Sequence, residues 1–118
     1  MGRLLLHIIL LSLLFLPGVS SAKDRDVITA NYQVNGVCEQ CKARIESSAY
    51  TKGVKFAEWN VDTHILSLKY DSSKTSADII LKNIATAGHD NEKYTAADQD
   101  YNKLPSCCRY RTVNKQRP

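Results

Sequence analysis

The pattern of hydrophobic and polar residues between positions 28 and 90 predicts five short elements. Residues 28–34 alternate between apolar and polar side chains, which is the period of a half-buried strand. Residues 54–61 and 65–70 are two further strand candidates, and the short turn between them favours a hairpin. Apolar residues at helical spacing predict one helix with Cys41 in its first turn, running to about Tyr50, and a second from Ser76 to Ala87.

A sixth element, a final strand over residues 92–96, is expected because the first strand would otherwise have an unpaired edge. The order of elements is then βαββαβ, two βαβ halves joined by a hairpin. Strands and helices with one apolar face each pack most economically as two layers. The sequence therefore predicts an α+β, ferredoxin-like fold, with two helices on one face of a four-stranded antiparallel sheet.

The first 22 residues have the character of a secretory signal peptide. Arg3 precedes an apolar run over residues 4–16, a Pro-Gly breaker follows, and Ser20 to Ala22 form a small-residue cleavage site. The apolar run is shorter than the roughly 20 residues that a membrane-spanning helix needs. We expect an exported protein whose mature chain begins at residue 23.

Charge divides the mature chain into two parts. We expect a domain over residues 23–97 and a basic C-terminal tail over 98–118, in which residues 101–118 carry basic side chains and no acidic ones. The small net positive charge lacks the dense basic stripe of a nucleic-acid-binding protein. The sequence contains no visible acid-base pair or activated nucleophile, so we do not expect an enzyme.

Four cysteines carry the candidate chemistry, and all four lie in the mature chain. Cys38 and Cys41 stand three residues apart where a loop enters a helix, and free N–H groups at a helix start favour thiolates. Thiolates select soft cations, and two sulfurs alone suit an ion of low coordination number. This pair predicts a soft-metal site, for Cu(I) or Hg(II) before Zn(II).

Three other interpretations of the cysteines stay open. A structural zinc site could use Cys107 and Cys108 as well, although zinc modules usually place their two pairs 15 to 20 residues apart. A dithiol pair can also exchange disulfides, and an export compartment favours disulfide chemistry. Four cysteines in a small exported domain could instead form structural disulfides that staple an interaction module.

The segment Gly36-Val37-Cys38-Glu39-Gln40-Cys41, with the Trp59 region and the Gly88-His89-Asp90 loop, resembles the heavy-metal-associated domain of copper chaperones and of periplasmic copper- or mercury-binding proteins. The resemblance covers about residues 27–96. It implies that Cys38 and Cys41 hold the metal on an exposed loop and pass it to a metal-transporting membrane protein or a second metal-binding domain. It also implies a periplasmic protein, as a monomer or a metal-bridged dimer. Gly36 stands where the family commonly has Met, so we expect looser packing beneath the loop.

His89, Cys107 and Cys108 are candidates for additional metal or redox roles. The resemblance places the loop of His89 beside the metal loop, where the imidazole could reach the ion or remain solvated. The adjacent Cys107 and Cys108 follow the last expected strand by about ten residues, which can span on the order of 30 Å. The tail is therefore long enough to fold back and bring this pair to Cys38 and Cys41.

Overall fold

A computed structural model of the chain describes residues 17–18 and 26–114. The predicted signal peptide thus lies outside the described residues, apart from Pro17 and Gly18. Within those ranges no helix is both long and apolar enough to cross a membrane. The elements, in chain order, are β1 (Val27–Gln33), α2 (Glu39–Ala49), β2 (Val54–Trp59), β3 (Ile65–Asp71), α3 (Ala77–Thr86), α4 (Asp98–Tyr101), the 3-10 helix η2 (Ser106–Cys108) and α5 (Tyr110–Asn114).

The three strands form one antiparallel sheet in the order β1-β3-β2. The register pairs Ala30 with Leu68 and Tyr32 with Leu66, so the alternation predicted from the sequence places these side chains on one face. Leu66 and Leu68, on the central strand β3, are fully buried, while Lys69 on the other face of that strand is exposed. The three predicted strands of this sheet and their hairpin are confirmed, with bounds that shift by one or two residues.

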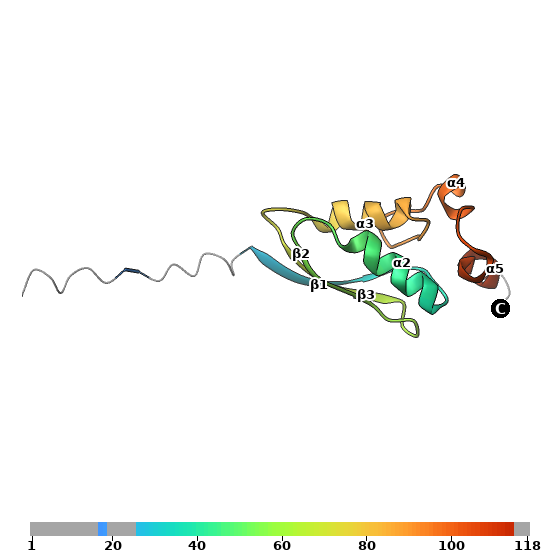
Figure 1. The fold of residues 1–118 in the computed structure, drawn as a ribbon, viewed down its shortest axis with the longest axis horizontal. Helices are drawn as coiled ribbons and strands as arrows, with labels where there is room; N and C mark the ends of the chain where they lie inside the picture. The colour runs from blue at the N-terminus through green and yellow to red at the C-terminus, as the bar shows by residue number, and fades with distance from the viewer. Residues whose placement is uncertain (1–16, 19–25, 115–118) are drawn as a thin grey trace, which may run out of the picture.

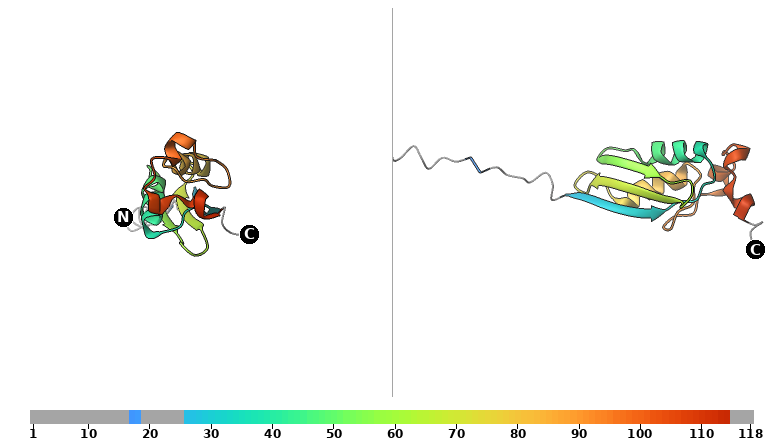
Figure 2. Two further views of the ribbon diagram at one scale, coloured as in Figure 1. Left: turned by 90° about the vertical axis from the view of Figure 1, so that its right-hand side faces the viewer. Right: turned by 90° about the horizontal axis from the view of Figure 1, so that it is seen from below.

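Helices α2 and α3 cover the same face of the sheet, as predicted (Figure 1, Figure 2). Helix α2 buries Cys41, Ile45 and Ala49, which recur every fourth residue along its inner stripe. Helix α3 begins at Ser76, whose hydroxyl accepts a hydrogen bond from the Ile79 N–H. Its inner face contributes Ile80, Leu81, Ile84 and Ala85 to the core.

The predicted fourth strand over residues 92–96 is wrong. The described residues form a three-stranded sheet, and beside β1 there is only an isolated bridge from Val34 to Asn91. The Asn91 side-chain oxygen accepts the N–H groups of Lys93 and Tyr94, and Asp90 accepts that of Ala96. Because these short polar side chains take up the backbone donors locally, the segment turns instead of pairing. The ferredoxin-like arrangement of the remaining elements is retained.

The C-terminal tail packs on the domain. Helices α4, η2 and α5 lie at the end of the molecule where α2 begins (Figure 1). Tyr101, Leu104, Cys108 and Tyr110 are buried in the same core cluster as the side chains of the sheet and helices. The described part of the tail, residues 98–114, therefore belongs to the folded unit.

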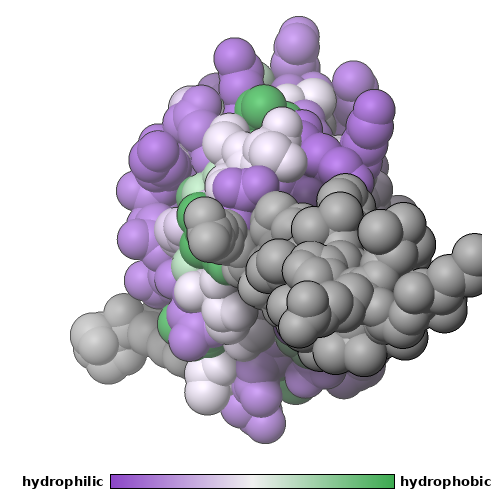
Figure 3. All heavy atoms as spheres, turned by 90° about the vertical axis from the view of Figure 1, so that its left-hand side faces the viewer, coloured by the Kyte–Doolittle hydropathy of each residue, from purple (hydrophilic) through white to green (hydrophobic). Residues whose placement is uncertain are grey.

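The opposite end of the molecule has a mainly hydrophilic surface. Figure 3 views that end, and among the described residues in view the hydrophobic side chains form small, separate spots. Single exposed apolar side chains of this kind are normal on folded proteins. The thiols lie at the other end, where α2 begins and η2 packs against it.

Candidate metal centre

The first two candidate thiols lie together at the start of α2. Cys38 is the residue that caps the helix, in an extended conformation with φ −148° and ψ 172°, and its carbonyl accepts the first helical hydrogen bond from Lys42. Cys41 lies one turn further along. Their sulfur atoms are 3.3 Å apart, so the predicted pairing of these thiols is found in the structure.

The two thiols differ in burial and in acidity. Burial by itself raises the pKa of the Cys38 thiol, but hydrogen bonds from N–H groups at the helix start and from neighbouring thiols outweigh it, so the pKa is lowered. Burial of Cys41, which is fully inaccessible, raises the pKa of its thiol to about 12. Cys38 is partly exposed. The pair therefore consists of one accessible, acidic thiol and one buried thiol, rather than two thiols on an exposed loop.

The packing beneath this loop is tight, contrary to the expectation from the Gly at position 36. The ring of Trp59 fills the space, because a Cβ atom added to Gly36 would lie 2.9 Å from its Cη2 atom. The Trp59 indole N–H donates to the carbonyl of Val34 at 3.0 Å. Glycine is required here by the close approach of the indole, which fixes the loop from below.

Cys108 is the third thiol at this site. Its sulfur lies 3.5 Å from that of Cys38, and the ligand atoms of Cys38, Cys41 and Cys108 all lie within 4.8 Å of one another. The tail thus folds back as its length allowed. Cys108 is fully buried, and all four cysteines have free thiols.

Cys107 stays outside this group of three. It is exposed, and its thiol donates to the side-chain oxygen of Gln40 at 3.1 Å. Its sulfur is 3.8 Å from that of Cys108. Partial desolvation of its sulfur, followed by the nearby Cys108, raises the pKa of the Cys107 thiol. A zinc site with four thiolates is therefore not assembled by the described residues.

Arg44 brings a positive charge to the site. It lies on α2, one turn after Cys41, and its Nη1 atom donates to the Cys108 sulfur at 3.3 Å. This hydrogen bond is charge-assisted, because the guanidinium donor carries a positive charge. The two-cysteine motif by itself assigns no role to Arg44, and its position one helical turn after Cys41 is the signal that the sequence contains.

The tail is anchored by contacts that do not involve sulfur. The buried Tyr110 hydroxyl donates to the carbonyl of Gly88 at 2.8 Å and accepts the N–H of Asp90 at 2.7 Å. The Arg111 guanidinium forms hydrogen bonds with the carboxylate of Asp90 and with the carbonyl of Ala96. These contacts hold α5 against the loop after α3. Because Cys108 precedes Tyr110 by two residues, they also fix where Cys108 lies.

His89 is a core residue rather than a ligand or a solvated loop residue. Its side chain is fully buried, its ring stacks on that of Tyr110, and it is absent from the group of converging ligand atoms. The Nδ1 atom lies 2.8 Å from the carbonyl of Asn35, which can only accept, so Nδ1 carries the hydrogen. Burial, assisted by Arg44, lowers the pKa of this imidazole.

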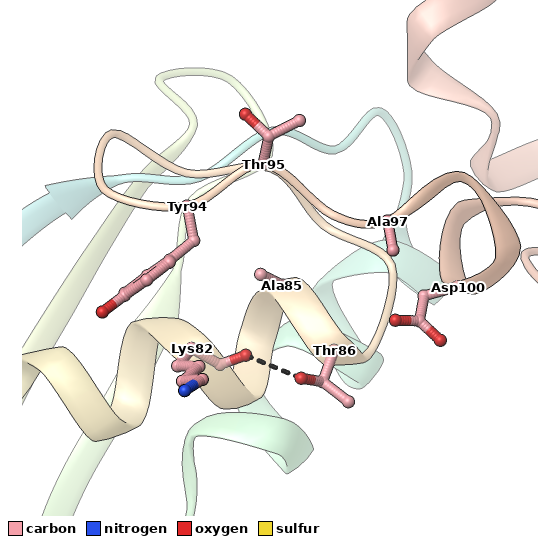
Figure 4. Close-up of a pocket in the computed structure, with 7 residues that line it drawn as sticks. All are labelled: Lys82, Ala85, Thr86, Tyr94, Thr95, Ala97 and Asp100. Atoms are coloured by element: carbon pink, nitrogen blue, oxygen red, sulfur yellow. Dashed lines mark hydrogen bonds between the residues drawn. The ribbon is translucent and has the colours of Figure 1, made fainter.

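One pocket lies away from the thiols, between α3 and the segment that replaces the fourth strand (Figure 4). Its volume is about 200 Å³. The Thr86 hydroxyl at its wall already donates to the carbonyl of Lys82 at 3.0 Å. No cysteine or histidine lines it, so it is not part of the thiol site; the lining residues are Lys82, Ala85, Thr86, Tyr94, Thr95, Ala97 and Asp100.

Comparisons with known proteins give likenesses among solved structures. No model of a known protein family matches the chain, and no characterised protein sequence matches it. A CopZ metallochaperone is 29% identical with a TM-score of 0.52, and the match covers 54% of this chain and 98% of CopZ. A candidate copper-ion-binding protein from Bacillus anthracis is 26% identical with a TM-score of 0.53, covering 56% of this chain and 96% of that one.

A third structure, oxidised MerP from Ralstonia metallidurans, shares the fold. It is 24% identical with a TM-score of 0.53, and the match covers 56% of this chain and 94% of MerP. Nearly the whole of each of these three proteins thus corresponds to about half of this chain. The order of elements, the two-cysteine loop at the start of α2 and these likenesses agree, and they bear out the resemblance to the heavy-metal-associated domain of copper chaperones.

Proposed function

We propose that this protein binds one soft metal ion, Cu(I) before Hg(II) or Zn(II), at Cys38 and Cys41 and acts as its carrier. The observation that carries the proposal is the convergence of the two sulfurs, 3.3 Å apart at the start of α2. Thiolates select soft cations over Mg²⁺ and Ca²⁺. The likeness to a CopZ metallochaperone supports a carrier rather than an enzyme.

Release by ligand exchange is consistent with the difference between the two thiols. Cys38 is partly exposed and has the lowered pKa, so an incoming thiolate of a partner can approach the ion on its side. Cys41 is fully buried and would hold the ion during the exchange. The receiving partner would be a metal-transporting membrane protein or a second metal-binding domain.

Export to the periplasm is also part of the proposal and rests on the sequence of residues 1–22. An exported carrier has to keep Cys38 and Cys41 reduced or loaded with metal, because that compartment favours disulfides. Mass spectrometry of the protein recovered from a bacterial periplasm should find a chain that begins at Lys23. Recovery of the uncleaved chain from the cytoplasm alone would contradict export.

The binding function is tested by titrating the reduced protein with Cu(I) under anaerobic conditions. The wild-type chain should bind one ion, and Cys38→Ser and Cys41→Ser should each abolish tight binding. Cys107→Ser is the matched control, since this thiol lies outside the converging group. Undiminished binding by the double variant of Cys38 and Cys41 would refute the proposed function.

A further inference from the structure

The tail brings to the two-cysteine loop a thiol that the resemblance does not account for. We propose that Cys108 is a third metal ligand, which closes the site of Cys38 and Cys41 into a buried group of three thiolates with Arg44 as its counter-charge. This inference rests on the proposed function, because it assumes that Cys38 and Cys41 bind a soft ion. It assigns to the C-terminal tail a direct part in metal binding.

The distances allow all three sulfurs to bind one ion. A metal that bonds to sulfur at about 2.3 Å can bridge two sulfurs that are up to about 4.6 Å apart. Cys38 lies 3.3 Å from Cys41 and 3.5 Å from Cys108, well inside that limit. The remaining separation, between Cys41 and Cys108, is at most 4.8 Å, so a shift of a few tenths of an ångström is enough. Each sulfur that enters as a thiol releases one proton to solvent when its bond to the metal forms.

Folding alone holds Cys108 in this position. The tail is anchored by the buried Tyr110 and by the ion pair between Arg111 and Asp90, and neither contact uses a sulfur atom. The Cys108 side chain is fully buried in the core cluster that also contains Tyr110. The third ligand is therefore preorganised, and binding does not have to meet the cost of ordering the tail.

The charge of the group explains the position of Arg44. Three thiolates around a monovalent ion carry a net charge of −2, and around a divalent ion −1. A buried net charge is costly unless a partner of opposite sign is close. The Arg44 guanidinium meets this need at 3.3 Å from the Cys108 sulfur. Lys42, on the same helix, is engaged by Glu46 and by the carbonyl of Trp59, so it is not available to the sulfurs.

The number of ligands bears on the choice of metal. Structural zinc sites are almost always tetrahedral with four protein ligands. Here the ligand atoms of Cys38, Cys41 and Cys108 converge, while Cys107 is turned toward Gln40 and His89 is not among the converging residues. The described residues therefore favour a soft ion that accepts three sulfurs, such as Cu(I) or Hg(II), over Zn(II).

The ligand number can be measured by X-ray absorption at the copper edge, on the full chain loaded anaerobically with one equivalent of Cu(I). Wild type should show three sulfur ligands and Cys108→Ser two, while both bind one ion. Competition with a Cu(I)-selective chelator should show at least tenfold weaker binding by Cys108→Ser. Cys107→Ser, the matched control, should equal wild type in both measurements.

Arg44→Gln provides a second test that does not alter a ligand. It should weaken Cu(I) binding by several-fold in the wild-type background, and this effect should vanish in the Cys108→Ser background, because the charge it balances is then absent. Lys55→Gln removes an exposed positive charge on β2 and should have no effect in either background. The melting temperature of each metal-free variant reports whether the tail remains folded.

The outcomes separate this inference from the proposed function. Two sulfur ligands in wild type, or equal affinities of wild type and a folded Cys108→Ser, would overturn the three-thiolate site and leave the two-cysteine carrier intact. If Cys108→Ser unfolds the tail, Arg44→Gln provides the deciding measurement. Two sulfur ligands in Arg44→Gln would overturn the three-thiolate site, and so would an effect of Arg44→Gln that persists in the Cys108→Ser background. If the wild-type chain does not bind Cu(I), the proposed function itself is refuted.

Discussion

Arg111 holds Asp90 through two hydrogen bonds, from Nη2 to Oδ1 at 2.8 Å and from Nε to Oδ2 at 3.2 Å. This two-point contact matches the planar guanidinium to the carboxylate and joins α5 to the loop after α3. Burial by itself raises the pKa of the Asp90 carboxyl, but the Arg111 guanidinium outweighs it and the pKa is lowered. The position of Cys108 beside Cys38 thus depends on a polar contact between the tail and the domain.

Arg111→Gln should lower the free energy of unfolding by about 1–3 kcal/mol, because it leaves the partly buried Asp90 carboxylate without its partner. Urea unfolding of the reduced, metal-free protein measures the change. Lys103→Gln removes another positive charge from the tail, but its side chain is 77% exposed, so it should cost less than about 0.5 kcal/mol. Equal effects of the two substitutions would contradict the anchoring role.

Stability should fall as the pH drops from about 7 toward 5, because His89 is buried in its neutral form. Its pKa is lowered in the folded state, so the unfolded chain takes up a proton first, near its ordinary pKa of about 6.5. The contribution of neutral His89 to the free energy of unfolding is fully present above that pKa. It is lost as the pH falls below that pKa, by up to about 1.4 kcal/mol per pH unit.

The test of this pH dependence is urea unfolding at several pH values between 5 and 8. His89→Gln should flatten the slope, since glutamine does not titrate. His64 lies in the connection between β2 and β3 and serves as the control, so His64→Gln should preserve the part of the slope that His89 produces. An unchanged slope in His89→Gln would show that the imidazole is not buried in neutral form.

Gly36→Met should destabilise the domain, although the family commonly has methionine at this position. The Trp59 ring occupies the space, and a Cβ atom at position 36 would meet it at 2.9 Å. Overpacking of this kind typically costs about 1–3 kcal/mol. The double variant Gly36→Met, Trp59→Leu should recover part of the loss in urea unfolding, whereas strictly additive effects would argue against this contact.

Cys38 should be the thiol whose alkylation persists longest as the pH is lowered. Its pKa is lowered, whereas that of the more exposed Cys107 is raised, and only the thiolate reacts. Iodoacetamide labelling followed by peptide mass spectrometry should show the ratio of Cys38 to Cys107 modification rising between pH 9 and pH 6. Cys41, buried and with a pKa of about 12, should react slowest. A ratio that does not change with pH would contradict the assigned acidities.

Much of the domain could be predicted from the sequence, because its signals are local. The alternation over residues 28–34 and the apolar stripe of Ile80, Ile84 and their neighbours report which side chains face a core, whatever that core is. The expected strand over residues 92–96 failed for a local reason as well. The side chains of Asp90 and Asn91 bind the backbone of that segment, and this competition is weakly visible in hydrophobic patterning.

The amino-acid sequence by itself determined the three paired strands, the two helices and the placement of Cys38 and Cys41 at a helix start. Each of these features depends on residues within one helical turn or one strand. Only the tertiary structure decided that Cys108 joins these thiols, that Arg44 faces it and that His89 is buried. Cys108 lies 70 residues from Cys38, and their contact is produced by the packing of Tyr110 and Arg111 on a distant loop. No local pattern reports such packing, because it depends on which surfaces the completed domain leaves uncovered.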